Sequence, residues 1–267
     1  MYRVIKAVMI KNRITTRRTY PLSFIISRVM GAVFALLGPI LLYYFVFEKN
    51  MSDRFIQATS NFNYMQYIVI GEVLNVLSFS TLMGVGRCLI TEQREGTLDS
   101  ILVTPMSRSG YYIGSYLEQF GRSLLEACLI LVFGVIVGAK IPIKYFPNIV
   151  ITIVLSSIAF FSVAVLVSSI MIYTRDTYLV QNTLYILMSC ICGVAYPIEY
   201  LPEVLKFIAY GFPLTYAINI TRCCVNGMNA INMKDYMCLI GLSIIYYVVG
   251  FYTFKLQEKK LIESVLA

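Results

Sequence analysis

Six apolar stretches separated by short polar segments form the main pattern of the chain. About 18 to 20 consecutive apolar residues are enough to cross a bilayer as a helix, and several of these stretches reach that length. We therefore predict an all-α, polytopic membrane protein that forms a single domain over residues 1–267. The six predicted transmembrane helices are residues 21–47, 64–86, 111–138, 149–173, 183–196 and 236–254.

The fifth apolar stretch differs from the others because prolines follow it closely. Pro197, Pro202 and Pro213 each lack a backbone N–H group, and each interrupts a helix. We therefore predict that residues 197–227 form short, broken helices that re-enter the membrane near one surface before the last span.

The first twenty residues, MYRVIKAVMIKNRITTRRTY, carry six lysines and arginines and no acidic residue. Val4, Ala7, Val8 and Ile14 are interleaved with these cations. A basic amphipathic helix of this kind lies in the plane of an anionic membrane surface. Residues 1–20 are therefore predicted to be an interfacial helix that contacts membrane lipids.

A polar segment between the second and third spans, EQREGTLDSILVTP at residues 92–105, has an unusual pattern. Leu98, Ile101 and Leu102 fall on one apolar face of a short helix. Gly96 permits a tight turn before that helix, and Pro105 stops it. Three carboxylates surround the helix start, where the helix dipole favours negative charge: these are Glu92, Glu95 and Asp99.

Such a helix, facing water, has no core of its own in which to bury its apolar face. It must either fold back on the membrane surface or dock into a groove on a partner. Its acidic character disfavours anionic lipid, so we expect a protein partner.

Composition supports a membrane protein and charge indicates its orientation. The chain is 58% hydrophobic and only 13% charged, too little charge to cover the surface of a soluble protein.

Outside the spans, 13 lysines and arginines lie on the side of the termini and 7 on the other side. The positive-inside rule therefore places both termini and residues 92–105 in the cytoplasm. Because topology explains the cations, the net charge of +8 does not call for a nucleic-acid partner.

Several kinds of chemistry are disfavoured by the residue types. The chain has no histidine, so no Cys/His zinc site and no histidine-assisted nucleophile is expected. The seven cysteines lie mostly within apolar runs, as small buried residues do. No G-x-x-x-x-G-K-[ST] phosphate loop occurs, so ATP is not bound in that way and no cofactor is predicted for this chain.

Charged residues within the predicted spans are costly, at least about 2.5 kcal/mol each. They are Arg28, Glu72, Glu118, Arg122 and Glu126. Counted along ideal helices, Arg28 comes level with Glu118 and Glu72 level with Glu126, so we predict one ion-pair network. Its role stays open: the network fixes helix register, or it is a polar lining of a transport path or a proton-sensitive switch.

Two long motifs resemble those of the permease subunit of type-2 ABC transporters, and they occur in the order found in that family. The first is E-x-x-E-G-T-L-D-x-I-L-V-T-P-x-S-R, which begins at Glu92. The second is CGVAYPIEYLPEVLKFIAYGFPLTYAINITR at residues 192–222, which carries Pro197, Pro202, Pro213 and Arg222. With the basic N-terminal helix and the order of spans, the resemblance covers nearly the whole chain.

This resemblance implies that residues 92–105 are a coupling helix in a cleft of a separate cytosolic ATPase, which binds ATP and magnesium. Residues 1–20 become a connecting helix, a second contact with the ATPase, and two permease copies, identical or related, form the transporter. The residues that match the coupling motif are Glu92, Glu95, Gly96, Thr97, Leu98, Leu102, Thr104 and Pro105.

The resemblance further implies an exporter in the cell membrane, without enzymatic activity in this chain. The form of the coupling motif is closer to exporters of drugs, lipids and peptide antibiotics than to those of polysaccharides or lipid-linked glycans. An ion-coupled secondary transporter is the other class, but it usually shows a repeat with paired broken helices. An intramembrane hydrolase is disfavoured because Glu118 and Glu126 are about 12 Å apart along one helix, too far to share a proton.

Overall fold

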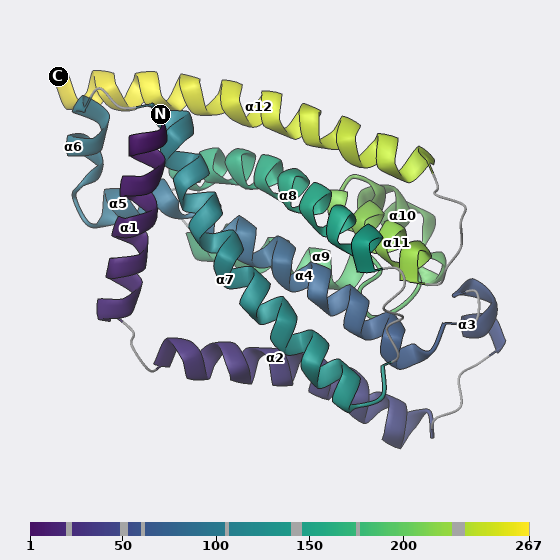
Figure 1. The fold of residues 1–267 in the computed structure, drawn as a ribbon. Helices are drawn as coiled ribbons and strands as arrows, with labels where there is room; N and C mark the ends of the chain where they lie inside the picture. Colours follow the sequence, from purple (N-terminus) through teal and green to yellow (C-terminus); the bar gives the residue numbers. More distant parts are fainter. Residues whose placement is uncertain are drawn as a thin grey trace.

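A computed structural model describes residues 1–19, 23–48, 53–59, 62–104, 107–139, 146–174, 177–225 and 233–266. Its regular elements in these ranges are all helical, which confirms the predicted class (Figure 1). The longer helices are α1 (Tyr2–Thr19), α2 (Ser23–Leu41), α4 (Tyr64–Gly86), α7 (Arg108–Ile136), α8 (Phe146–Thr174), α9 (Thr177–Ile191), α11 (Pro213–Val225) and α12 (Met233–Leu266). The shorter ones are the π-helix η1 (Leu42–Val46), α3 (Asp53–Ala58), α5 (Cys88–Arg94), α6 (Leu98–Val103), the 3-10 helix η3 (Ile198–Tyr200) and α10 (Glu203–Tyr210).

Among the described residues, five helical segments are long and apolar enough to cross a membrane. They are Val29–Val46, Tyr64–Gly86, Arg108–Ile136, Pro147–Ile172 and Met233–Leu256. The predicted fifth span corresponds to α9, whose apolar part, Asn182–Ile191, is shorter. The polytopic architecture is thus confirmed, while the count of six spans stays a prediction.

The predicted end of the fifth span, at residue 196, is wrong because α9 already ends at Ile191. Gly193 has a φ of +77°, in the left-handed region where an α-helix cannot continue and glycine is favoured. The predicted broken helices follow as η3, α10 and α11. Pro197 and Pro202 each stand directly before a helix, and Pro213 is the first residue of one, where its missing N–H costs no helical bond.

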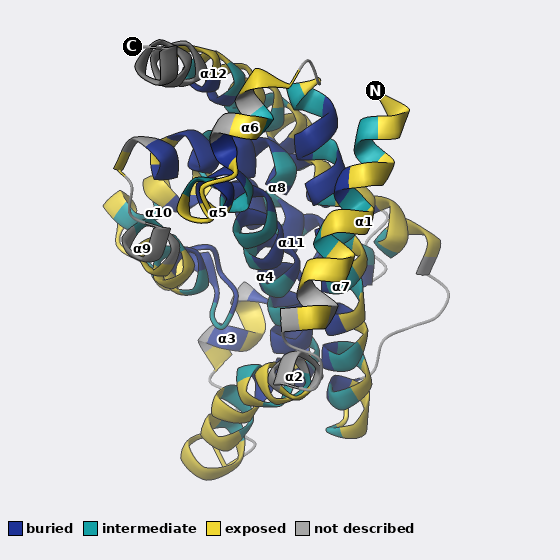
Figure 2. Cartoon of the chain, turned by 90° about the vertical axis from the view of Figure 1, so that its left-hand side faces the viewer, coloured by how far each residue is buried: buried dark blue, intermediate teal, exposed yellow. Residues whose placement is uncertain are grey.

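Helix α4 lies at the centre of the bundle and is buried along most of its length, packed against α7, α8 and α11. In contrast, α2 and α12 expose rows of large apolar side chains (Figure 2). Soluble helices rarely show such faces, whereas helices of membrane proteins do. The core of the bundle therefore forms around α4 and α8.

Helix α1 lies crosswise to the spans. In Figure 1, α2 and α12 run across the view while α1 stands upright beside the first turns of α7. After a quarter turn, Figure 2 shows α2 and α12 nearly end-on, and α1 is still upright. Helix α1 lies at one end of the bundle, together with the N-terminus, α6 and the end of α12. We call this the termini end.

Two glycines of α7 allow α1 to pack closely. A Cβ atom on Gly114 would lie 2.9 Å from the Ile5 carbonyl oxygen and 2.9 Å from the Val8 Cβ, and one on Gly110 would lie 3.4 Å from Val4. The Gly110-x-x-x-Gly114 spacing thus forms a notch for α1, as small residues do between membrane helices.

We predict that Gly114→Ala displaces α1, because the added methyl group overlaps the α1 backbone. The melting temperature of detergent-purified protein should fall, and trypsin should cut α1 faster at its lysines and arginines. Gly121→Ala is the matched control, because a Cβ atom there meets nothing within 4 Å. Equal behaviour of the two variants would contradict the close packing.

Candidate functional site

The 92–105 segment forms two short helices joined by an exposed turn rather than one helix. Helix α5 continues directly from the end of α4 and ends at Arg94, and α6 begins at Leu98. Gly96, at the turn, has a φ of +72°, which confirms the predicted role of this glycine. The turn and α6 therefore project from the termini end of the bundle.

Glu92 is buried, with only 4% of its surface exposed. Its carboxylate forms an ion pair with Lys11 of α1, accepts a hydrogen bond of 2.8 Å from the Tyr111 hydroxyl, and accepts one of 2.5 Å from the Thr97 hydroxyl. We call these four side chains the Glu92 cluster. It joins α1, α5, the start of α6 and the start of α7 through one carboxylate.

The environment of Glu92 changes the pKa of its carboxyl group. Burial by itself raises this pKa, but the hydrogen bonds from Lys11, Thr97 and Tyr111 and the charge of Lys11 outweigh it and leave the pKa below its ordinary value of 4.5. Glu92 is thus ionised at neutral pH and holds its three partners by charge-assisted bonds.

Sequence reasoning missed Lys11 and Tyr111 as members of this cluster. Lys11 was counted among the lipid-facing cations of α1. However, Lys11 lies seven residues after Val4 and three after Val8. At this spacing it shares the helix face that packs on α7. That spacing is the signal that could have identified it.

The expectation that the apolar face of α6 lacks a core within the chain is wrong. Leu98 is only 4% exposed and belongs to the main hydrophobic core, and Ile101 packs against that core. The Arg108 guanidinium also donates a 2.7 Å hydrogen bond to the Ile101 carbonyl, near the end of α6. The segment therefore folds back on its own bundle, with α6 packed against α5.

Other residues of the segment face outward. Glu95, Gly96 and Thr97 are exposed in the turn, and Val103 (74%) and Thr104 are exposed at the end of α6. The side chains of Asp99 and Leu102, and the whole of Pro105, lie outside the described residues. The exposed surface of the segment is thus its turn and its far end, not the predicted Leu98 face.

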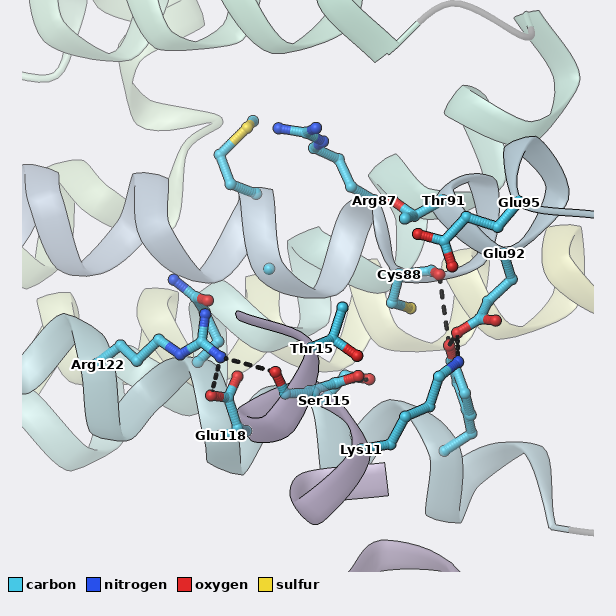
Figure 3. A pocket seen from close by; sticks show the side chains of 15 residues that line it. Lys11, Thr15, Arg87, Cys88, Thr91, Glu92, Glu95, Ser115, Glu118 and Arg122 are labelled. Carbon is cyan, nitrogen blue, oxygen red and sulfur yellow. Dashed lines mark hydrogen bonds and ion pairs between the residues drawn. The ribbon is translucent and has the colours of Figure 1, made fainter. Parts of the chain in front are cut away.

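A pocket of about 470 Å³ lies between α1, the α4–α5 junction and the first half of α7 (Figure 3). Figure 3 shows Lys11 and Glu92 at one end of it and Glu118 and Arg122 at the other. We call it the α1–α7 pocket. Its lining is Lys11, Asn12, Thr15, Met83, Gly84, Arg87, Cys88, Thr91, Glu92, Glu95, Tyr111, Ser115, Glu118, Gln119 and Arg122.

The predicted intramembrane charges make contacts at three places. Arg122 forms an ion pair with Glu118 and donates a 3.3 Å hydrogen bond to the Asn12 carbonyl of α1. Glu126 is buried and accepts a 2.7 Å hydrogen bond from the Ser80 hydroxyl of α4. Glu72 accepts a 3.4 Å hydrogen bond from Asn75. The side chain of Arg28 lies outside the described residues, so the single network stays a prediction.

At the opposite end of the bundle, Arg222 of α11 is buried and holds the bend after α9. Its guanidinium donates hydrogen bonds to the carbonyls of Gly193 (2.8 Å), Val194 (3.0 Å) and Tyr67 of α4 (2.9 Å). It also stacks on the Tyr67 ring, 3.3 Å from its centroid. The arginine of the second motif thus joins α4, the bend and α11.

Comparison with known proteins agrees with this arrangement. The model of the ABC-2 type transporter family matches residues 4–224, most of the chain, which includes the Glu92 cluster and Arg222. A comparison with curated proteins gave no match. The chain belongs to the ABC-2 type transporter family. It is therefore a permease component of an ABC transporter and not the ATPase.

We predict that Glu92→Gln costs about 1 to 3 kcal/mol at neutral pH, because it removes the charge from three buried bonds. A carboxylate with a lowered pKa stabilises the fold above its unfolded pKa, and this is lost as pH falls through the folded value. Thermal melts at pH values below 4.5 should therefore bring wild type and variant together. Glu203→Gln, at an exposed position of α10, is the control; a difference that persists at low pH would contradict this assignment.

We predict that Arg222→Lys destabilises the protein by about 2 to 3 kcal/mol, because an ammonium cannot reproduce the planar fork that reaches three carbonyls. Tyr67→Phe is the matched control. It keeps the stacked ring and removes the hydroxyl, which contacts the Gly193 carbonyl at 3.4 Å and also interacts with the Arg222 guanidinium. Thermal melts would measure both, and an Arg222→Lys protein as stable as Tyr67→Phe would be inconsistent with this role.

Proposed function

We propose that this chain is the membrane-spanning subunit of an ATP-driven exporter in the cytoplasmic membrane. A separate cytosolic ATPase binds ATP and magnesium, and a second permease copy, identical or related, completes the transporter. The substrate is a lipophilic drug, a lipid or a peptide-antibiotic-like compound. The observation that carries this proposal is the family match, which spans both the 92–105 segment and the broken helices.

The ATPase contact in this proposal is the exposed part of the 92–105 segment. Glu95, Gly96, Val103 and Thr104 face outward at the termini end. Val103 is an apolar side chain that is 74% exposed on a helix beyond the spans, a position suited to a partner's groove. Buried Leu98 and Glu92 serve the same contact indirectly, since they fix the position of α6.

Movement of the ATPase reaches the spans through the Glu92 cluster. Because α5 continues directly from α4, a displacement of the turn acts on a span as well as on α1 and α7. The bonds to Glu92 are charge-assisted and end on a buried carboxylate, so these elements move together rather than separately. This arrangement supports coupling by rigid displacement of the termini end.

The substrate class is supported by polar groups inside the bundle. Asn75 of α4 is only 2% exposed and donates hydrogen bonds to Glu72 and to Ser189 of α9 (3.2 Å). Within the described chain, its Oδ1 atom is buried without a hydrogen-bond partner. Nearby, Phe79 and Tyr185 rings contact each other across the same two helices. These groups are buried between α4 and α9 here, so an amphiphile with an apolar body and a hydrogen-bond donor would meet them once the two helices separate.

The proposed orientation places both termini and the 92–105 segment in the cytoplasm, and the α1–α7 pocket at the cytoplasmic side of the membrane. The excess of lysine and arginine at the termini end supports it. The broken helices and Arg222 then lie at the outer surface, where the substrate leaves.

The experiment compares Val103→Asp with Leu98→Asp in tagged permease purified from its native membranes. Val103→Asp should lower recovery of the partner ATPase about tenfold or more, because a charge enters an apolar groove, while the melting temperature stays within about 1 °C of wild type. Leu98→Asp should lower the melting temperature, because it places an unpaired charge in the core.

The recovered partner must itself contain a phosphate-binding loop and hydrolyse ATP, with hydrolysis stimulated by the permease. Ile14→Asp, exposed on α1 at the same end, controls for added surface charge. Undiminished recovery of the ATPase with Val103→Asp would exclude the proposed contact. Absence of any ATPase from wild-type preparations would count against the proposed function itself.

A further inference from the structure

The α1–α7 pocket is lined by four helices, α1, α4, α5 and α7. Helix α1 supplies one side with Lys11 and Thr15, α4 and α5 supply Arg87 and Glu95, and α7 supplies Glu118 and Arg122. Its volume of about 470 Å³ is in the range of sites for small molecules and lipid headgroups. A ligand inside it would touch α1, α5 and α7 together.

The charges of the lining indicate what kind of ligand fits. Three cations, Lys11, Arg87 and Arg122, are balanced by three carboxylates, Glu92, Glu95 and Glu118. A ligand with a large net charge would lose its hydration there without a net opposite charge to compensate. A zwitterion avoids this cost, since its ammonium can donate to carboxylates and its phosphate can accept from guanidinium groups.

The position of the pocket indicates where such a ligand comes from. Helix α1 lies crosswise to the spans, in the orientation of a helix in the plane of a membrane surface. On its outer side, Ile10 and Ile14 are 48% and 46% exposed, among exposed Arg3, Lys6 and Arg13. Apolar side chains among basic ones are typical of the headgroup region of a leaflet. The pocket thus lies at the depth of the lipid headgroups.

We propose that the α1–α7 pocket binds the phosphoethanolamine headgroup of a phospholipid from the leaflet at the termini end. This role is separate from the transported substrate and does not depend on the proposed function. Because α1 forms one wall, the lipid binds only when α1 is docked, and by linkage it stabilises the docked arrangement of α1 and the Glu92 cluster. The lipid would therefore act as a structural regulator of the 92–105 segment.

The test uses the full chain in nanodiscs that contain phosphatidylglycerol at one fixed fraction. The remaining lipid is either phosphatidylethanolamine or phosphatidylcholine, whose quaternary ammonium has no N–H to donate. Both mixtures have the same net charge and present the lipid in both leaflets, so the result does not depend on orientation. The melting temperature of wild type should be about 4 °C or more higher with phosphatidylethanolamine.

Thr15→Phe fills the pocket from the α1 wall, and Ile14→Phe is its matched control on the neighbouring, outward-facing residue. The difference between the two lipids should disappear in Thr15→Phe and persist in Ile14→Phe. Each variant is compared with itself in two lipids, so a general loss of stability cancels. General effects of phosphatidylethanolamine on the bilayer also cancel, because they would act equally on both variants.

Soluble phosphoethanolamine added to phosphatidylcholine nanodiscs identifies the source. Little stabilisation at millimolar concentration supports a membrane lipid as the ligand, whereas full stabilisation would show that a free metabolite is enough and overturn the lipid assignment. The proposal as a whole is overturned if wild type melts equally in both lipids, or if Thr15→Phe retains the wild-type difference. Recovery of an ATPase partner is unaffected by either outcome, so the proposed function is tested separately.

Discussion

A single buried carboxylate organises the termini end of this permease. Glu92 accepts bonds from three side chains that lie on α1, on α7 and at the start of α6. An unpaired charge in this place would be strongly destabilising, so the cluster forms complete or not at all. Helix α6, the exposed turn and helix α1 are all joined through it, in addition to the apolar packing of α1 on α7 and of Leu98 in the core.

The sequence predicts the architecture well where composition alone decides it. Long apolar runs indicate spans whatever their neighbours, and prolines mark the broken helices, because a missing N–H acts locally. The end of α9 could not be placed by counting hydrophobic residues, since Cys192, Val194 and Ala195 are as apolar as the helix before them. Only the φ of Gly193, which depends on the packing of the bend, ends the helix there.

The site was predicted less completely, because its residues meet through tertiary packing. The sequence identifies Glu92 and Leu98 as special, yet both were interpreted as partner contacts. Whether an amphipathic helix covers its own bundle or another protein depends on what lies beneath it, and the core around Leu98 comes from distant segments. Lys11 is 81 positions from Glu92, so no local pattern joins them.

The bonds of Arg222 have a consequence for how the end of the bundle opposite the termini can move. The Arg222 guanidinium of α11 binds the Tyr67 carbonyl of α4 and the Gly193 and Val194 carbonyls of the bend. These three parts of the chain therefore form one rigid unit. Breaking the Arg222 bonds would leave buried carbonyls without a donor and a buried guanidinium charge without acceptors. Any movement at this end must therefore displace the three parts together. Bending is then confined to the helices that lead away from them. One arginine then fastens three separate segments, and any bending must occur further along the helices that leave it.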